Sequence, residues 1–274
     1  MHPILIDLGW FRVPTYGPLF ALGIVSAVYT AFRLGRREGL DPDRLIDFST
    51  WLLIVGLLGS KVLLVLTTWN SYKSFGEIFS WNTIQSAGVF YGGFAAATFF
   101  AIWYIRVYRL PMLKIFDIYA PGIALAQSIG RLGCFAAGCD YGKPTTSFLG
   151  VVFTNPLSSF TGVPLNVRIY PTQIFESLAT FLIFGILLWQ YRRKSFDGQI
   201  FIIYLSLYAV ARFFLEFLRG DEDRGFVFNH LLSTSQFIAI LALATAAAMT
   251  LALRRRSRKT GQNALPLEVK RVRG

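Results

Sequence analysis

The chain is short of charged residues and of the side chains that most often carry metal or acid–base chemistry. Only 15% of its 274 residues are charged, 54% are hydrophobic, and it has two histidines and two cysteines. This composition is too apolar for a soluble domain of the same length. We see no histidine or carboxylate partners that would complete a zinc site with the cysteines, so we expect no metal and no cofactor. Internal repeats are also lacking.

Long hydrophobic runs are what the sequence does contain. Runs of about 20 residues recur, and each is long enough to cross a hydrocarbon core of roughly 30 Å as a helix. The predicted fold class is therefore an all-α integral membrane protein with seven transmembrane helices. We expect these helices over Pro18–Phe32, Leu45–Leu66, Gly88–Tyr108, Ile115–Phe135, Pro171–Tyr191, Gln199–Leu218 and Leu231–Leu253. Because no basic segment precedes the first apolar run, we expect that run to be retained rather than cleaved as a signal peptide.

The net charge of +12 is distributed as expected for a membrane protein. Most basic residues fall in every second connection between the predicted spans, in clusters that begin at Arg33, Arg106 and Arg192, and in the tail that begins at Arg254. The positive-inside rule makes this side cytoplasmic, which places the N-terminus outside and the C-terminus inside. We thus expect one membrane domain over residues 1–253 and a basic cytoplasmic tail over residues 254–274. The tail suits contact with anionic membrane lipids, and we expect no nucleic-acid partner.

Two longer connections lie on the opposite, outer side. They are Thr67–Ala87 and Ala136–Tyr170, and long ordered connections of this kind often handle substrate. Within the second, Phe148–Phe153 is apolar and β-branched enough for a short strand. We expect the two connections to form a small periplasmic cap.

Four ionisable residues interrupt the predicted spans, namely Lys61, Arg131, Arg212 and Glu216. A charge at membrane depth costs a few kcal/mol or more, so such residues usually face a polar cavity and mark a functional site. Three of the four are cations, and phospholipid phosphate is the abundant anion of a membrane. The alternative, a self-neutralising pair of Arg212 with Glu216, leaves the other cations unexplained.

Helical spacing and depth bring more polar groups to the same level. At ~1.5 Å per residue, Lys61 and Arg131 lie about 24 Å from the inner face and Arg212 about 20 Å. Residues four apart share a helix face. We expect the following residues to converge in the outer third of the bilayer with these cations: Tyr16, Tyr91, Gln173, Glu176, Tyr208, Glu216 and Arg219. The glycines beside them, Gly92, Gly93, Gly130 and Gly133, have an alternative role in close helix packing.

The segment Gly130-Arg131-Leu132-Gly133-Cys134-Phe135, running on to Gly142, resembles the signature of the prolipoprotein diacylglyceryl transferase family. Further motifs follow in the family's order and spacing, and the resemblance extends to about Leu253. These motifs are Tyr16-Gly17, Tyr91-Gly92-Gly93, Pro171-Thr172-Gln173 with Glu176, and Tyr208 through Arg212, Glu216 and Arg219.

The resemblance implies a seven-span enzyme of the bacterial inner (plasma) membrane. Such an enzyme transfers the diacylglyceryl group of phosphatidylglycerol to the lipobox cysteine of a preprolipoprotein signal peptide and releases glycerol phosphate. This is the first step of lipoprotein maturation. Arg131, Arg212, Glu216 and Tyr91 are the predicted catalytic residues. Phosphatidylglycerol binding is predicted for Arg131 together with Tyr16, Lys61, Tyr208, Arg219, Gln173 and Glu176.

Several positions depart from the family's pattern. The family usually has asparagine at Cys134 and Ala137, glutamate at Cys139, and histidines at Tyr91 and Tyr170. His2 and His230 fall in no motif. The general base is therefore open between Tyr91 and Glu216, and a thiol close to Arg131 would need little help from either.

Two further questions stay open at this stage. Cys134 and Cys139 have three interpretations: small packing residues, a disulfide, or reactive groups. Two alternative functions are open as well: a lipid-binding or transport protein that uses the same cationic cavity, and a paralogue with another substrate, which the departures favour.

Overall fold

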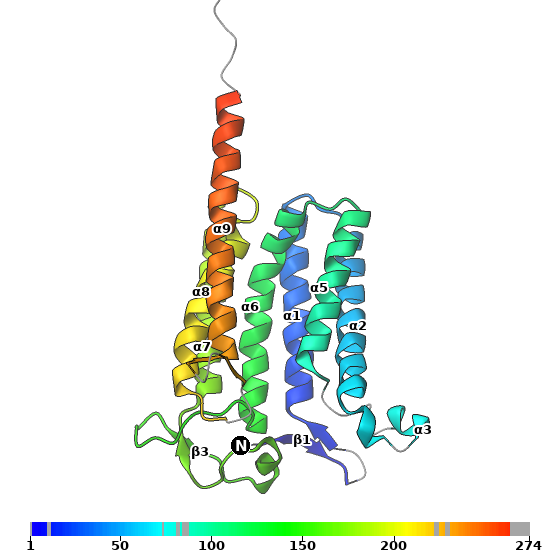
Figure 1. Cartoon of the computed structure of the whole chain (residues 1–274), viewed down its shortest axis with the longest axis vertical. Helices are drawn as coiled ribbons and strands as arrows, with labels where there is room; N and C mark the ends of the chain where they lie inside the picture. Colours follow the sequence, from blue (N-terminus) through cyan, green and yellow to red (C-terminus); the bar gives the residue numbers. More distant parts are fainter. Residues whose placement is uncertain are drawn as a thin grey trace, which may run out of the picture. The chain divides into compact units, whose positions relative to one another are not determined.

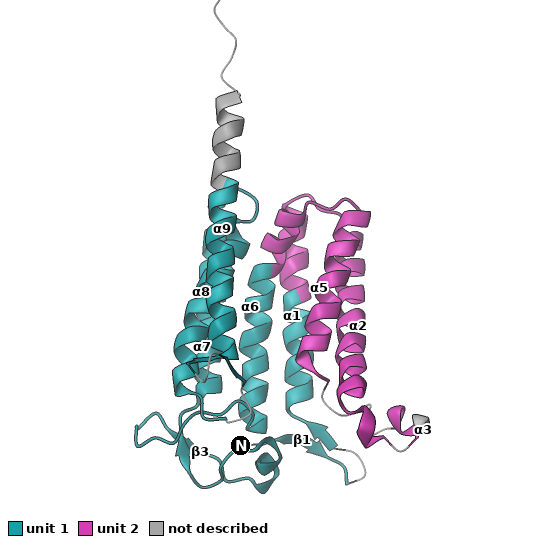
Figure 2. Cartoon of the chain, in the orientation of Figure 1, with its two compact units in different colours: residues 1–27, 120–274 teal, residues 28–119 magenta. Residues whose placement is uncertain are grey.

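The computed structural model describes residues 2–9, 12–72, 74–80, 83, 88–221, 225–227 and 231–263. His230, the tail beyond residue 263 and part of the connection 67–87 lie outside the described residues. The chain forms two compact units (Figure 2). Unit 1 holds residues 1–27 and 120–274, and unit 2 holds residues 28–119.

The described part of the chain is mostly helical (Figure 1). Its α-helices are α1 (Tyr16–Arg37), α2 (Pro42–Thr67), α3 (Phe75–Ile78), α5 (Phe90–Val107), α6 (Met112–Ala137), α7 (Thr172–Tyr191), α8 (Gln199–Leu215) and α9 (Thr234–Asn263). Three short 3-10 helices are η1 (Trp69–Ser71), η2 (Pro156–Thr161) and η3 (Glu216–Leu218).

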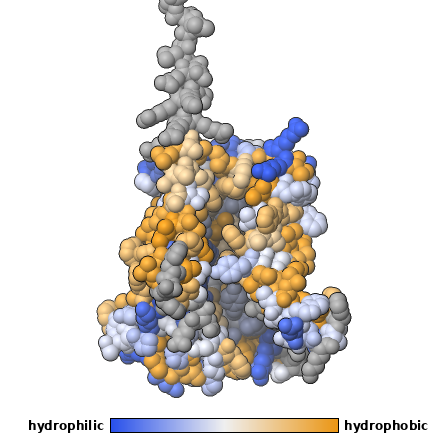
Figure 3. Space-filling model, in the orientation of Figure 1, coloured by the Kyte–Doolittle hydropathy of each residue, from blue (hydrophilic) through white to orange (hydrophobic). Residues whose placement is uncertain are grey.

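Six described helices are long and apolar enough to cross a membrane: α1, α2, α5, α7, α8 continued through η3, and α9. On the face shown in Figure 3, hydrophobic side chains dominate the helices and hydrophilic ones gather toward their ends. The protein is therefore a multi-pass membrane protein. The remaining predicted span, Ile115–Phe135, lies within α6, whose 26 residues are long enough. Polar residues such as Asp117, Gln127 and Arg131 dilute its hydropathy, and the count of seven stays a prediction.

The strands form three antiparallel pairs outside the long helices. They are β1 (Ile4–Asp7) with β2 (Arg12–Pro14), β3 (Val151–Val152) with β4 (Arg168–Ile169), and β5 (Phe226–Val227) with β6 (Leu232–Ser233). The predicted strand Phe148–Phe153 is present only in part, as β3 over Val151–Val152. Phe153 next to it is fully buried against Val163 and Ile169. The connection between α6 and α7 thus has a small core of its own.

In unit 2, glycines let α2 and α5 approach closely. A Cβ on Gly92 would lie 2.5 Å from the carbonyl oxygen of Gly59, and one on Gly93 would lie 2.9 Å from that of Gly56. This confirms the packing interpretation for Gly92 and Gly93.

In unit 1, small residues and serines bring three helices together. Gly23 of α1 faces the backbone of Ala126 on α6, and Gly122 of α6 faces the backbone of Ala27. Between α6 and α7, the Ser128 hydroxyl donates to the Ser177 carbonyl at 2.9 Å, and the Ser177 hydroxyl is within 2.9 Å of the Ser128 carbonyl. These contacts fix the register of α6 against α7 one turn away from Arg131.

Candidate functional site

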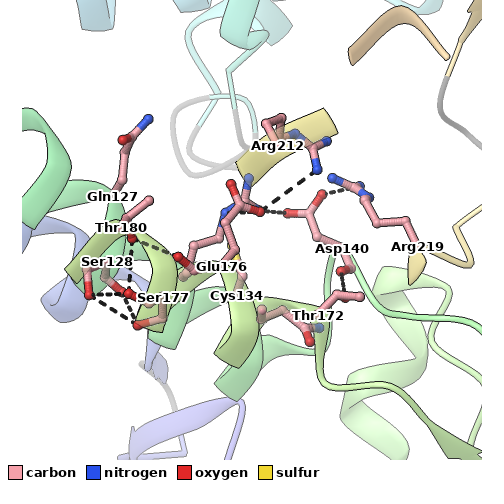
Figure 4. Close-up of polar contacts among 12 residues, drawn as sticks. Gln127, Ser128, Cys134, Asp140, Thr172, Glu176, Ser177, Thr180, Arg212 and Arg219 are labelled. Atoms are coloured by element: carbon pink, nitrogen blue, oxygen red, sulfur yellow. Dashed lines mark hydrogen bonds and ion pairs between the residues drawn. The ribbon is translucent and has the colours of Figure 1, made fainter. Parts of the chain in front are cut away.

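Two arginines from different helices of unit 1 meet at one buried carboxylate, Glu176, which Figure 4 shows with Arg212. Glu176, in the second turn of α7, is 5% exposed. Its Oε2 lies 3.1 Å from Nε of Arg131 on α6 and 4.0 Å from Nη1 of Arg212 on α8. The Tyr208 hydroxyl donates to its Oε1 at 3.3 Å. A buried carboxylate is costly without such partners, so Glu176 and the two arginines hold one another in place.

The end of α6 shapes the next part of the site. The Cys134 carbonyl accepts hydrogen bonds from the backbone N–H groups of Gly138 at 2.8 Å and Cys139 at 3.2 Å. Gly138 has a left-handed φ of 95°, which is the usual glycine end of a helix. Asp140, with a φ of 56°, then turns its side chain back toward the helix.

Asp140 bridges two arginines that are far apart in sequence. Its Oδ2 accepts from Arg131 Nη1 at 2.7 Å, and its Oδ1 accepts from Arg219 Nη2 at 2.6 Å. Burial alone would raise the pKa of Asp140, but the charges of Arg131 and Arg219 outweigh burial and hold that pKa below its ordinary value. Arg219 also pairs with Asp221.

Two side chains at the start of α7 anchor the loop that carries Asp140. The Thr172 hydroxyl donates to the Asp140 carbonyl at 2.8 Å, and Gln173 Nε2 donates to the Cys139 carbonyl at 2.7 Å. Gly142 packs so closely that a Cβ there would lie 2.3 Å from the Tyr170 carbonyl oxygen. The loop also pairs with the segment that carries Arg219, through the bridge between Gly142 and Arg219. Asp140 is therefore fixed from several sides.

Where α8 continues into η3, the predicted spacing places Arg212 and Glu216 together. Arg212 Nη2 lies 3.0 Å from Glu216 Oε2 and donates to Ser235 Oγ at 2.9 Å. Arg212 Nη1 is buried and has no hydrogen-bond partner among the described residues, although it lies at ion-pair distance from Glu176. Arg212 Nη1 is therefore available to donate a hydrogen bond to a ligand.

The arginines of this group are all paired with carboxylates, including those that the Arg212–Glu216 pair alone left unexplained. Arg131, Arg212 and Arg219 each pair with at least one carboxylate. The carboxylates are Asp140, Glu176, Glu216 and Asp221. Sequence reasoning missed Asp140 and Asp221 because both lie outside the predicted spans. The signal for Asp221 was its position two residues after Arg219, while Asp140 follows the position where the family has glutamate.

The other predicted site residues have different surroundings. Gln173 is buried, and its known partner is the loop carbonyl rather than an arginine. Tyr16 is 40% exposed at the start of α1, and a Cβ on Gly133 would lie 3.1 Å from its ring. Gly130 faces open space. Packing thus accounts for Gly133 but not for Gly130.

Lys61 and Tyr91 belong to unit 2, which is described by itself. Lys61 Nζ donates to the Thr83 carbonyl at 3.0 Å. Tyr91 is 58% exposed in the first turn of α5, with its ring against Phe90. Their predicted part in the site therefore stays a prediction.

Both cysteines are free thiols, so the disulfide alternative is not realised in this structure. The expectation that no carboxylate lies near them is wrong. The two sulfurs and a carboxylate oxygen of Asp140 all lie within 4.8 Å of one another. Both Asp140 oxygens already accept from arginines, which limits what that carboxylate can offer a cation.

Comparison with known proteins gives consistent matches over nearly the whole chain. The family model described as prolipoprotein diacylglyceryl transferase matches residues 3–252. The chain is 37% identical to a phosphatidylglycerol–prolipoprotein diacylglyceryl transferase of Clostridium tetani, over 89% of this chain and 94% of the relative. A second relative, transferase 2 of Clostridium perfringens, is 35% identical over 89% and 92%. A third, from Dehalococcoides mccartyi, is 30% identical over 96% and 98%.

Proposed function

The chain belongs to the prolipoprotein diacylglyceryl transferase family, and from that premise we propose that it lipidates preprolipoproteins. The acceptor would be the lipobox cysteine of the signal peptide and the donor phosphatidylglycerol. The thiol sulfur attacks the glycerol carbon that carries the phosphate, a C–S bond forms, and the C–O bond to phosphate breaks. Glycerol phosphate leaves with the electron pair, and the thiol proton passes to a base.

The convergence of Arg131 and Arg212 at Glu176 is the observation that supports this chemistry most directly. Negative charge grows on the phosphate as the C–O bond breaks. Cations that are already oriented in a water-poor site stabilise that charge without reorganising. Arg212 Nη1 is buried and without a hydrogen-bond partner among the described residues, which suits a phosphate oxygen. We therefore assign Arg131 and Arg212 to the phosphate.

The remaining site residues support these two arginines. Glu176 on α7 holds Arg131 and Arg212, Tyr208 on α8 donates to Glu176, and Glu216 pairs with Arg212. Arg219 positions Asp140 by pairing with it, and Gln173 holds the loop that carries Asp140. Tyr16 and Lys61 would line the lipid-binding region. Tyr91 and Glu216 are the two alternatives for the base that takes the thiol proton.

The membrane arrangement we propose has seven spans, with α6 as the polar one. Its length suffices, and Arg131, its charged residue in unit 1, pairs with Asp140 and Glu176. Residues 1–253 would form one catalytic domain in the bacterial inner membrane, with the N-terminus outside and the basic tail 254–274 in the cytoplasm. The connection 136–170, which carries Asp140 and has its own small core, would belong to a periplasmic cap.

The test is a transfer assay with purified protein, phosphatidylglycerol labelled in its acyl chains, and lipobox peptides with cysteine or serine at the acceptor position. We expect label on the cysteine peptide only, with glycerol phosphate released in equal amount. Arg131→Ala and Arg212→Ala should each lower the rate by about 10² to 10³, the usual cost of losing one oxyanion donor. Phe variants at Tyr91 and Gln variants at Glu216 would separate the two alternatives for the base.

The matched control is Arg12→Ala. Arg12 lies in β2 and pairs at 3.2 Å with Asp7, and both side chains are about half exposed. The exposed pair contributes little, so this variant should transfer at the wild-type rate. Undiminished transfer by Arg131→Ala or Arg212→Ala would overturn the site. Solute movement without glycerol phosphate release would restore the transport alternative, which the named relatives do not favour.

A further inference from the structure

Two thiols lie side by side where α6 ends, and the proposed transfer step uses neither. Cys134 is buried in the last turn, and Cys139 is half-buried in the loop. The helix-ending bonds from Gly138 and Cys139 to the Cys134 carbonyl bring these two side chains against each other, as is typical of this kind of helix end. Cys139 Sγ also lies 3.8 Å from that carbonyl oxygen.

A metal ion is the less suitable occupant of this place. With Asp140, the two sulfurs form the only group of potential metal ligands found among the described residues. The two Asp140 oxygens are committed to Arg131 and Arg219, whose charges would repel a cation. Only two sulfurs then remain, which is short of the four ligands of a structural zinc site.

We propose that Cys134 and Cys139 are a reversible redox couple, and that their oxidation to a disulfide lowers the transfer activity. The second half of this inference rests on the proposed function. The first half depends only on the two thiols, because a disulfide requires side chains that already lie close together, as these do.

Exposure and acidity give the two thiols different tasks in thiol–disulfide exchange. Cys139 is the more accessible, and a hydrogen bond with Cys134 holds the pKa of Cys139 below its ordinary value. The Cys139 thiolate attacks a low-molecular-weight disulfide and releases one thiolate. The Cys134 thiolate then attacks the Cys139 sulfur of the mixed disulfide and releases the second. The oxidant is thereby reduced to two thiols, which take up the two protons that the cysteines lose.

The backbone couples this oxidation to the site. Cys139 directly precedes Asp140, and the carbonyls of these two residues are fixed by Gln173 and Thr172. Gly138 and Asp140 both have left-handed φ values, so the loop has little freedom to absorb a shift. Drawing Cys139 toward Cys134 therefore moves Asp140 relative to Arg131 and Arg219. A displacement of about 1 Å at such a position can cost 10²-fold in rate.

The experiment incubates the full-length protein in phosphatidylglycerol-containing nanodiscs with mixtures of reduced glutathione and glutathione disulfide. Free thiols are counted by maleimide labelling and intact mass, transfer is measured on the lipobox peptide, and hydrogen exchange is followed in the peptide that spans residues 138–142. The control is Cys134→Ser combined with Cys139→Ser. Cys134→Ala serves as a second control, because it leaves one thiol and no disulfide within the chain.

We expect the wild type to lose both thiols and two hydrogens in mass. Its rate should fall by about 10²-fold, exchange in the 138–142 peptide should change, and dithiothreitol should reverse all three. The double variant should transfer equally in both redox states. Absence of an internal disulfide would overturn the redox couple. A disulfide that alters neither rate nor exchange would overturn its effect on the site. A reduced wild type that never transfers, yet oxidises with changed exchange, would overturn the proposed function and leave the couple standing.

Discussion

Replacing Asp140 with asparagine tests whether the bridge between Arg131 and Arg219 positions the site. Asparagine keeps the size of the side chain and removes its charge. Asp140 accepts at 2.7 Å from Arg131 and at 2.6 Å from Arg219, so two charge-assisted hydrogen bonds are weakened at once. Each is worth about 1.5–3 kcal/mol when well buried.

Solvent reduces that magnitude here. The Asp140 side chain is 32% exposed, whereas those of Arg131 and Arg219 are 20% and 9% exposed. Asparagine also keeps one amide oxygen as an acceptor. We therefore expect a loss of about 2 kcal/mol in the free energy of unfolding, which lies between an exposed and a buried ion pair. For a chain of this size the loss corresponds to a decrease of roughly 4–8 °C in Tm.

Activity should fall more than stability. Arg131 would keep its contact with Glu176, but the partner that fixes its Nη1 would change from a charged to a neutral group. We expect kcat in the transfer assay to fall by about 10²-fold, with a smaller change in KM for phosphatidylglycerol. Asp140→Glu, which restores the charge, should recover part of the loss. If Asp140 only supported the fold, Asp140→Asn and Asp140→Glu would have the same kcat whenever they had the same Tm.

The control for Asp140→Asn is Asp7→Asn, which removes a carboxylate from the exposed pair with Arg12. Its effect should remain within about 0.5 kcal/mol, as is usual for a surface substitution. A double-mutant cycle with Arg219→Gln then measures the coupling of Asp140 to Arg219 directly. Wild-type Tm and wild-type kcat in Asp140→Asn, or a coupling energy near zero, would refute the bridge as a positioning element.

Two further predictions concern packing and pH. Gly122→Ala should lower the free energy of unfolding by about 1–3 kcal/mol in chemical denaturation, because its Cβ would lie 2.6 Å from the Ala27 carbonyl oxygen. Gly130→Ala, on the same helix and facing open space, should be neutral or stabilising by up to about 1 kcal/mol. The lowered pKa of Asp140 means that the folded state binds its proton less readily than the unfolded state. Its contribution to stability is thus complete above about pH 4 and is lost as the pH falls through the folded-state pKa, so Tm measured from pH 7 to 3 should fall more for the wild type than for Asp140→Asn.

The helices were predictable from the sequence because their signal is local. Long apolar runs with basic residues at alternate ends indicate membrane helices regardless of how the helices pack, and six of the predicted spans coincide with apolar helices. The pairing of Arg212 with Glu216 was predictable for the same reason, since a spacing of four residues fixes their contact on a helix.

The Asp140 bridge was not predictable because it depends on the path of a loop. Asp140 and Arg219 are 79 residues apart, and they meet only because the chain turns at Gly138 and packs against the segment 218–220. Helix periodicity carries no information about such a turn. The contact of Gln173 was not predictable for the same reason. Its position on the helix indicates a side chain that faces the site, but its amide donates to the Cys139 carbonyl of that loop.

The carboxylates among the arginines also bear on turnover. If Arg131 and Arg212 bind phosphate as proposed, cations without counter-charges would hold the released glycerol phosphate as well as they hold the transition state. Tight binding of the product would slow its release, and product release limits the rate of many enzymes. Glu176 lies within ion-pair distance of both arginines and can pair with them again as the product leaves. The near balance of charge in this site therefore favours release, while Arg212 Nη1 still offers a donor to the departing phosphate.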